Sequence, residues 1–424
     1  MRRRPLAMSL SGNRDFRLLF LGRSVSLLGD GAFLVALAWE AYTLSNAPTA
    51  LSLIGVAMTV PTISLLLFGG VVSDRYERRT VMLLADALRA VLLLLAGSLA
   101  LAGSLGLWQL IVIVACYGAA QAFFDPASDA ILPEIVTPEE LGRANALEQV
   151  ARPMTLRLLG PAIGGVLVGT LGSGAAFMAD GASFIVSAAT LWLMASSPAL
   201  RRTAAAVADG GTAVRQVLEG WAYVRRHVWL WGTFASAGIA YLLFMGPAEV
   251  LLPFMVKHEL HGNGFQLGLV FGAGGLGSVA CAVTIMRGGL PDSSVSFIYM
   301  SWTLATLAVA GYGVASAVWQ LMLASLAFNL LETGGTIVWA TLKQRLVPGG
   351  LLGRVSSLDW LISIGLLPVS FALTAPVSSI LGVRTTLVAA GLAGAMATLG
   401  GLALPGMRAT EHTAGAQVSA GAGV

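Results

Sequence analysis

Long apolar stretches alternate with short polar connections along almost the whole chain. Each stretch has about 20 residues or more with few charges, which is the length that an α-helix needs to cross the hydrocarbon core of a bilayer. The pattern predicts an all-α membrane protein with twelve transmembrane helices. They are expected at residues 16–42, 48–72, 81–103, 107–131, 145–171, 174–196, 230–256, 264–286, 294–315, 317–341, 355–381 and 385–405.

A short segment returns at the same place in the two sets of six spans. Residues 141–148 read Leu-Gly-Arg-Ala-Asn-Ala-Leu-Glu, and residues 352–359 read Leu-Gly-Arg-Val-Ser-Ser-Leu-Asp, each after the fourth span of its set. We therefore expect two pseudo-symmetric six-helix bundles. Glu148 and Asp359 are expected in the first turn of the fifth and eleventh spans, where a carboxylate caps the positive end of the helix dipole.

The predicted domains follow from these spans. The N-terminal bundle is expected at residues 16–196 and the C-terminal bundle at residues 230–405. An N-terminal segment at 1–15, a linker at 197–229 and a tail at 406–424, which is expected to be disordered, complete the chain. Apolar side chains at helical spacing in the second half of the linker predict an amphipathic helix at the membrane interface.

The composition supports a membrane protein. Hydrophobic residues make up 56% of the chain and charged residues 11%, and the mean hydropathy is +0.81, whereas about 25% of a soluble domain is charged. The 51 glycines suit close packing of helices in lipid. Cys116 and Cys281 fall inside apolar spans, so neither a disulfide framework nor a metal site is expected.

Arginine and lysine gather in alternate connections. The N-terminal segment, the connection after the second span and the middle interval are rich in them, whereas the opposite connections hold only Lys257 and Arg384. By the positive-inside rule, both termini and the middle interval are expected in the cytoplasm of a multi-pass plasma-membrane protein. The formal charge of +4 therefore reflects topology and does not suggest a nucleic-acid partner.

The connection after the second span carries a burst of charge. Residues 69–80 read Gly-Gly-Val-Val-Ser-Asp-Arg-Tyr-Glu-Arg-Arg-Thr. This segment resembles the loop between helices two and three of the major facilitator superfamily, usually Gly-x-x-x-Asp-Arg-x-Gly-Arg-Arg. Glu77 stands where the pattern has its second glycine. The matching residues are Gly70, Asp74, Arg75, Arg78 and Arg79.

Further segments narrow the resemblance. Residues 125–147 carry Asp-Pro, Leu-Pro-Glu and Leu-Gly-Arg-Ala-Asn-Ala-Leu elements, and residues 160–165 read Gly-Pro-Ala-Ile-Gly-Gly. Together they resemble the branch of the superfamily that contains siderophore, macrolide and multidrug exporters of the drug:proton antiporter type. The second segment is similar to an antiporter motif without its usual upstream glycines, and its matching residues are Gly160, Pro161, Gly164 and Gly165.

The resemblance implies two bundles that rock around a shared central cavity, and a monomer that carries a small molecule without a cofactor. From the residues themselves, Asp74 is expected to dock on the N-terminus of a neighbouring helix in one conformation. Arg78 is expected to pair with Asp125 or Asp129 at the cytoplasmic end of the fourth span. Arg75 and Arg79 are expected to enforce topology.

Acidic residues inside the spans are the candidates for proton coupling. They are Asp30, Asp180, Glu249 and Glu332. An ionised carboxylate near the bilayer centre costs ~3 kcal/mol, so a carboxyl that exchanges a proton there is a simple coupling device. The alternatives are a charge pair between Asp30 and Arg23, which share a helix face, and a hydrogen-bonded strut for the other three.

Other side chains in the spans are interpreted as structural or as lining a cavity. Asp86 and Arg89, three residues apart on the third span, are expected to form a structural ion pair. An apolar pocket for a bulky amphipathic substrate needs aromatic walls, although each candidate could equally pack inside a bundle or lie in the aromatic belt. The candidates are Phe33, Phe123, Tyr241, Phe244, Asn329, Trp339 and Trp360.

Motifs for catalysis are missing from the sequence. It has no phosphate-binding Gly-x-x-x-x-Gly-Lys-Ser/Thr motif and no His/Cys cluster with metal-ligand spacing, so neither an enzyme nor an ATP-driven pump is expected. The sequence predicts a secondary transporter that exports a lipophilic or amphipathic molecule in exchange for protons. The alternatives are an uptake carrier or lipid flippase of the same fold, and a receptor or scaffold that does not transport.

Overall fold

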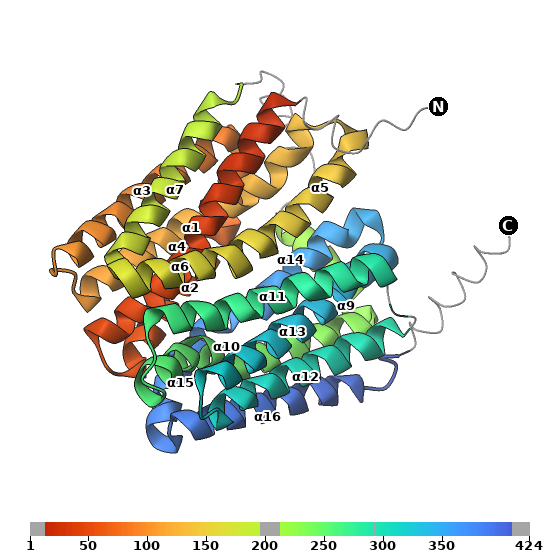
Figure 1. Ribbon diagram of the computed structural model, residues 1–424. Helices are drawn as coiled ribbons and strands as arrows, with labels where there is room; N and C mark the ends of the chain where they lie inside the picture. Colours follow the sequence, from red (N-terminus) through yellow and green to blue (C-terminus); the bar gives the residue numbers. More distant parts are fainter. Residues whose placement is uncertain (1–12, 196–212, 290, 292, 409–424) are drawn as a thin grey trace. The chain divides into compact units, whose positions relative to one another are not determined.

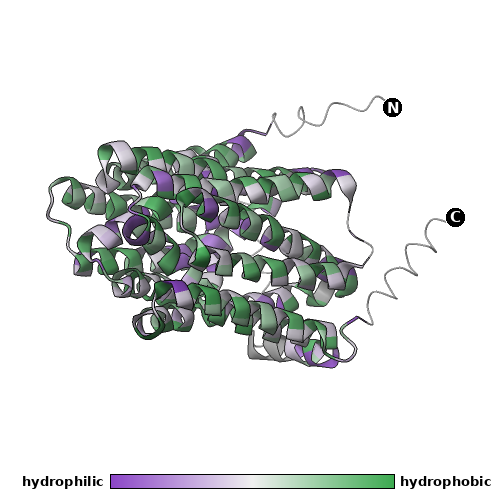
Figure 2. Cartoon of the chain, turned by 60° about the horizontal axis from the view of Figure 1, so that its bottom comes forward, coloured by the Kyte–Doolittle hydropathy of each residue, from purple (hydrophilic) through white to green (hydrophobic). Residues whose placement is uncertain are grey.

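The computed structural model describes residues 13–195, 213–289, 291 and 293–408. Over these residues, twelve helical segments are long and apolar enough to cross a bilayer, as the hydropathy pattern predicts. Hydrophobic residues cover most of their length, and hydrophilic residues interrupt them at few places (Figure 2). The predictions for most of the N-terminal segment, the first part of the linker and most of the tail lie outside the described residues.

The helices group into two compact units, and each is described by itself. The first unit comprises Met1–Gly210 with Gly262–Gly272. Its chain runs through six spans, and the fifth of these is interrupted by a π-helical segment, η2. The elements are α1 (Arg14–Leu44), α2 (Pro48–Arg75), α3 (Arg78–Leu101), α4 (Leu107–Ile135), α5 (Pro138–Arg152), η2 (Pro153–Leu159), α6 (Gly160–Leu171) and α7 (Ser173–Leu193).

Within the first unit, α1 packs against α6 and α7, and α3 packs against α4 and α7 (Figure 1). Helix α2 packs mainly against α4. This arrangement brings polar residues of α1, α3, α4 and α7 toward one another at the middle of the unit. Those residues form the site described below.

The second unit comprises Gly211–His261 and Ala273–Val424. Helix α12 packs against α13 and α16, and α10 packs against α15 and α16. The elements are α9 (Ala213–Arg226), α10 (Val228–Phe254), η4 (Met255–Glu259), α11 (Gly264–Gly288), α12 (Ser294–Val314), α13 (Val318–Leu346), α14 (Gly349–Gly365), α15 (Leu367–Leu381) and α16 (Val383–Leu402). The first part of α11, up to Gly272, belongs to the first unit. A helix, α9, thus lies in the second half of the predicted linker, and its place at the membrane interface stays a prediction.

Local sequence sets the helix ends. The side chain of Asn13 accepts hydrogen bonds from the backbone N–H groups of Asp15 and Phe16, which caps α1. Gly172 separates α6 from α7 with φ +85°, and Gly382 separates α15 from α16 with φ +82°. Because other residues adopt this conformation only with strain, glycine permits the same sharp turn at corresponding places in the two sets of spans.

The predicted position of two acids was wrong. Glu148 and Asp359 do not lie in the first turn of a helix, because α5 begins at Pro138 and α14 begins at Gly349. Each acid lies ten residues beyond the first residue of its helix, so the helix dipole is too distant to matter. Instead Glu148 pairs with Arg23, and Asp359 pairs with Lys343. The repeated segment thus places an acid inside the helix at equivalent positions.

Candidate functional site

Asp30 of α1 is hydrogen-bonded to Tyr117 of α4. The phenol of Tyr117 donates to a carboxylate oxygen of Asp30, and its ring stacks on Phe33 with a centroid distance of 5.1 Å. Tyr117 is buried, whereas Asp30 is partly exposed. The alternative of a pair between Asp30 and Arg23 was wrong, because Arg23 pairs with Glu148. The carboxyl of Asp30 is thus bonded to a neutral donor, which does not fix it in the ionised form as a directly paired cation would.

Arg89 of α3 lies next to this pair. It forms the expected ion pair with Asp86 and also donates a 3.2 Å hydrogen bond to the Gln121 side chain. Its guanidinium lies over the rings of Phe124 and Phe184, at 4.2 and 4.3 Å from their centroids. Only 2% of Arg89 is exposed. The cation is therefore fixed by charge, hydrogen bonding and aromatic faces together.

Asp180 of α7 is a third acid in the same region. It is completely buried and accepts a 3.0 Å hydrogen bond from Ser183. Its other carboxyl oxygen, Oδ2, is buried without a hydrogen-bond partner among the described residues. Asp180 lies close enough to Asp30 and Arg89 to interact with both electrostatically. A side chain at Gly29 would collide with Asp180, so glycine at that position lets α1 and α7 meet here.

Three acids therefore share one buried cation. In the described part of the first unit, Arg89 is the only buried Lys or Arg; Asp86 pairs with it directly, Asp30 and Asp180 interact with it electrostatically from inside the bundle, and the partly exposed Asp125 does so from the cluster's edge. Arg89 compensates the charge of its direct partner Asp86. A second ionised carboxylate without a cation is costly in a membrane interior, so this cluster is suited to holding a proton on Asp30 or Asp180.

A polar stripe on α4 leads from this cluster toward the predicted cytoplasmic end. Tyr117, Gln121, Asp125 and Asp129 follow one another at four-residue steps, so they share one helix face. Gln121 donates to both carboxylate oxygens of Asp125 at 3.1 Å. Exposure rises along the stripe: Tyr117 is buried, Gln121 and Asp125 are partly exposed, and the Asp129 side chain is 80% exposed.

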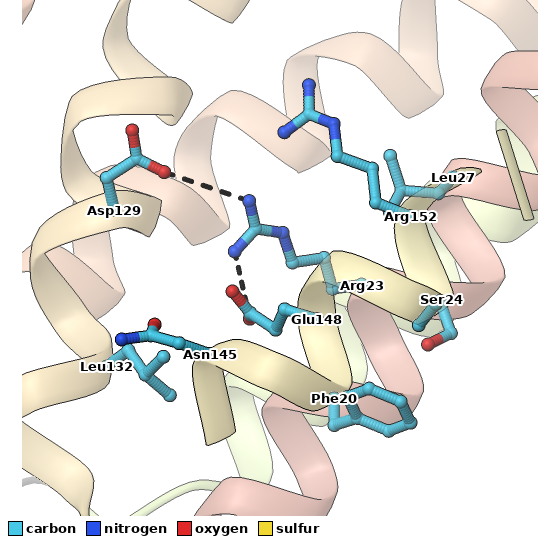
Figure 3. Close-up of a pocket in the computed structure, with 10 residues that line it drawn as sticks. Phe20, Arg23, Ser24, Leu27, Asp129, Leu132, Asn145, Glu148 and Arg152 are labelled. Atoms are coloured by element: carbon cyan, nitrogen blue, oxygen red, sulfur yellow. Dashed lines mark hydrogen bonds and ion pairs between the residues drawn. The ribbon is translucent and has the colours of Figure 1, made fainter. Parts of the chain in front are cut away.

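The stripe ends at a pocket between α1, α4 and α5 (Figure 3). The pocket has a volume of about 260 Å³. Arg23 lies at its centre and contacts Glu148 at 3.0 Å and Asp129 at 3.8 Å. Arg152 of α5 is also part of the wall, and Figure 3 shows the guanidinium of Arg23 between Asp129 and Glu148.

The Gly-Pro-Ala-Ile-Gly-Gly segment packs α6 onto α1 directly beside Asp30. A Cβ at Gly160 would lie 2.7 Å from Cα of Gly31, and one at Gly164 would lie 2.6 Å from Cα of Ala32. The two backbones are thus closer than any larger side chain would allow. Pro161 and Gly165 of the same motif are also buried. The motif holds the helix that carries Asp30.

The charged loop is bound differently from the prediction. Arg78 pairs with Glu134 and donates a 2.9 Å hydrogen bond to the carbonyl of Ala130, so the expected pairing with Asp125 or Asp129 was wrong. Asp125 is held by Gln121, and Asp129 faces Arg23. The reason is position along α4, because Glu134 lies in the last turn of the helix and is nearest to the loop.

The other motif residues have distinct environments. Arg79 donates to the carbonyls of Leu191 and Trp192 at 2.6 Å, which satisfies the C-terminal end of α7, beyond the topological role expected of it. Arg75 is exposed, and Gly70 has open space where a Cβ would lie. The side chain of Asp74 lies outside the described part of the structure.

The acidic candidates of the second unit lie in different surroundings. Glu249 is exposed on α10. Glu332 of α13 is partly exposed and accepts a 3.0 Å hydrogen bond from Thr336, and Asn329 donates to the carbonyl of Ser325 at 2.9 Å. None of these contacts resembles the three-acid cluster around Arg89, and a coupling role for Glu249 or Glu332 stays a prediction.

The predicted cavity aromatics divide into two groups. Phe33, Phe244 and Trp339 are buried in the packing of their own units, and Trp339 donates a 2.9 Å hydrogen bond to Asp359. The others are at least partly exposed: Phe123 and Tyr241 are partly exposed, and Trp360 is 63% exposed. Because their side chains are at least partly exposed, only Phe123, Tyr241 and Trp360 of these predicted aromatics are available to contact a ligand.

Sequence reasoning missed Tyr117 and Gln121. A signal for both was present, because they precede Asp125 by eight and four residues and so share its face on an otherwise apolar helix. No group of three or more His, Cys, Asp or Glu residues within the described ranges is arranged to hold a metal ion.

Several bacterial transporters are similar in sequence to this chain at low identity. The enterobactin exporter EntS of Citrobacter koseri is 28% identical over 363 residues, which cover 81% of this chain and 80% of the relative. The multidrug efflux pump Tap of Mycolicibacterium fortuitum is 28% identical over 268 residues, covering 60% and 63%. The uncharacterized MFS-type transporter YfiS of Bacillus subtilis is 24% identical, and the match spans only 55% of its length.

Solved transporter structures share the fold. A bacterial homologue of the iron transporter ferroportin in its inward-facing state has a TM-score of 0.66 at 18% identity, covering 92% of this chain and 99% of that one. The nucleoside transporter NupG has a TM-score of 0.70 at 10% identity, with the same coverage. The family model "Major Facilitator Superfamily" matches residues 19–363. Because that match covers most of the chain, the protein belongs to the Major Facilitator Superfamily of transporters.

Proposed function

We propose that this protein exports a lipophilic or amphipathic small molecule in exchange for protons by alternating access. The observation that carries the proposal is the cluster in which Asp30, Asp86 and Asp180 share Arg89 as the buried cation. Such a cluster binds and releases a proton at low energetic cost. One cation does not neutralise three ionised carboxylates, so a carboxyl of the cluster is readily protonated. We assign the exchangeable proton to Asp30, which is partly exposed, with Asp180 as its buried neighbour.

The polar stripe of α4 supplies a path for that proton. Tyr117 contacts Asp30, Gln121 bonds Asp125, and the exposed Asp129 ends the stripe. In the proposed topology both termini are cytoplasmic, so Asp129 faces the cytoplasm and receives the proton on its way in. The protein then acts in the plasma membrane, where the proton gradient points inward and drives export.

Two relatives support the direction of transport. One is named as an enterobactin exporter and the other as a multidrug efflux pump. Both names describe export of a bulky organic molecule. We carry that direction and that broad substrate class to this chain as part of the proposal.

The test is gradient-driven uptake into everted membrane vesicles, with enterobactin and the lipophilic dye Nile red as probes. Entry of a probe only when the lumen is acidic is the expected result. Asp30→Asn should abolish this accumulation while counterflow of the probe, which needs no proton, continues. Glu40→Gln is the matched control, because Glu40 is a partly exposed acid on the same helix outside the cluster. Accumulation that ignores the gradient, or that survives Asp30→Asn and Asp180→Asn together, contradicts proton coupling.

A further inference from the structure

One charged side chain in the wall of the pocket between α1, α4 and α5 has no direct bonding partner among the described residues. Three of its four charged side chains are engaged, because Arg23 contacts both Glu148 and Asp129. The fourth, Arg152, makes no side-chain hydrogen bond or ion pair with the described residues and is exposed. It reaches Asp129 only through longer-range electrostatic attraction. A guanidinium with five N–H donors therefore faces the pocket without a bound acceptor.

A second free donor lies in the same wall. Asn145 lies on α5 seven residues before Arg152, so the two share a helix face. In the described part of the chain the amide of Asn145 has no hydrogen-bond partner, and the residue is exposed. Both acids of the pocket face Arg23, Glu148 at 3.0 Å and Asp129 at 3.8 Å. The donors of Arg152 and Asn145 lie on the same helix and are unused, and donors of this kind suit an acidic group.

The rest of the wall is partly apolar. Phe20 and Leu27 of α1 line the pocket beside the charged residues. A volume of about 260 Å³ accommodates an acidic head with a part of the body attached to it, since pockets for whole drug-sized molecules begin near about 300 Å³. The combination fits an amphipathic acid, with its hydrocarbon against Phe20 and Leu27.

We propose that this pocket binds the carboxylate of an amphipathic substrate, with Arg152 as its main partner and Asn145 as a second donor. The inference rests on the proposed export function, because it names the class of molecule that the transporter takes up from the cytoplasmic side. The place of the pocket fits this role. Leu27 lines it, and Asp30 follows three residues later on the same face of α1. A bound acid thus lies beside the path of the proton.

Equilibrium binding of two matched fluorescent probes tests the proposal. Dansylglycine carries a carboxylate, and dansylglycinamide is its neutral counterpart. The purified full-length protein in lipid nanodiscs should bind the acid at least about tenfold more tightly than the amide, because a charge-assisted hydrogen bond contributes that much. Arg152→Gln should remove this preference, Arg152→Lys should retain part of it, and Asn145→Ala should reduce it.

The controls separate this inference from the export proposal. Arg143→Gln changes another exposed arginine of α5 that is not part of the pocket wall, and it should keep the full preference for the acid. The proposal is overturned if the native protein shows no saturable binding of dansylglycine, binds both probes equally, or keeps its preference in a folded Arg152→Gln variant. Each of these results leaves proton-driven export untouched.

Discussion

Tyr117 donates a hydrogen bond to Asp30 across the interface between α4 and α1. The first prediction concerns this bond. Tyr117→Phe keeps the ring stacked on Phe33 and removes only the donor. A hydrogen bond to a charged group contributes about 1.5–3 kcal/mol, and proton exchange at Asp30 passes through its ionised form, so gradient-driven accumulation should slow about tenfold or more. Initial rates in everted vesicles measure this effect.

The control for that variant is Tyr42→Phe, which removes a hydroxyl from a buried tyrosine near the C-terminal end of α1. It should transport at close to the native rate. Equal slowing in both variants would mean that the loss of any buried hydroxyl disturbs the bundle, and the role assigned to Tyr117 would be wrong.

The second prediction concerns the stability of the pair between Arg89 and Asp86. Arg89→Leu leaves Asp86 buried with Ser187, at 2.6 Å, as its one hydrogen-bond donor among the described residues. Breaking a buried pair from one side costs about 3–5 kcal/mol. Thermal unfolding of the purified protein should show a large drop for this variant. The double variant with Asp86→Leu should recover part of the loss, and a double variant less stable than Arg89→Leu would contradict this account.

The third prediction concerns the glycine contact between α6 and α1. Gly164→Ala inserts a methyl group 2.6 Å from Cα of Ala32, where backbone atoms cannot yield easily. Overpacking of this kind costs about 1–3 kcal/mol. Gly353→Ala is the matched change, because Gly353 also lies within a helix but has open space around a Cβ. It should be neutral or stabilise the protein by about 0.5–1 kcal/mol. Thermal unfolding distinguishes the two, and equal stability would contradict the tight contact.

The fourth prediction compares the two equivalent acids. Asp359→Asn leaves Lys343 buried without its anionic partner, which should cost about 3–5 kcal/mol. Glu148→Gln leaves Arg23 in contact with Asp129 and with the pocket, and it should cost only about 1 kcal/mol. Midpoints of thermal denaturation measured under one set of conditions test this difference. A larger loss of stability for Glu148→Gln than for Asp359→Asn would contradict the argument that the more buried pair contributes more.

The spans could be predicted from sequence because the bilayer sets one length for all of them. The first span, expected at 16–42, is found as Arg14–Leu44, and the last, expected at 385–405, is found as Val383–Leu402. Hydropathy does not mark where a helix begins in water. The helix that begins at Pro138 therefore starts before its apolar run, and that is why Glu148 was placed in the wrong turn.

The partners of the charged residues could not be predicted in the same way. Sequence indicated that Arg78 meets the end of the fourth span, but it did not decide among acids that lie at different heights on that helix. Glu134 is the partner because the connection to α3 is short and reaches only the last turn. The bond between Tyr117 and Asp30 joins positions 87 residues apart, and such a contact depends on how two helices are rotated about their axes, which hydropathy alone does not specify.

The wide π-helical turn from Pro153 to Leu159 lies between Arg152 and Gly160. Such a turn inserts residues beyond the regular α-helical count, so it sets the angular phase between the pocket-facing side of α5 and the glycine face of α6. Removing a single residue there would rotate one face against the other by about 100°. Arg152 would then point away from the pocket while Gly164 still met α1. The π-helical segment is therefore a spacer of fixed length, in which an insertion or deletion should disturb both faces while many substitutions leave them in place.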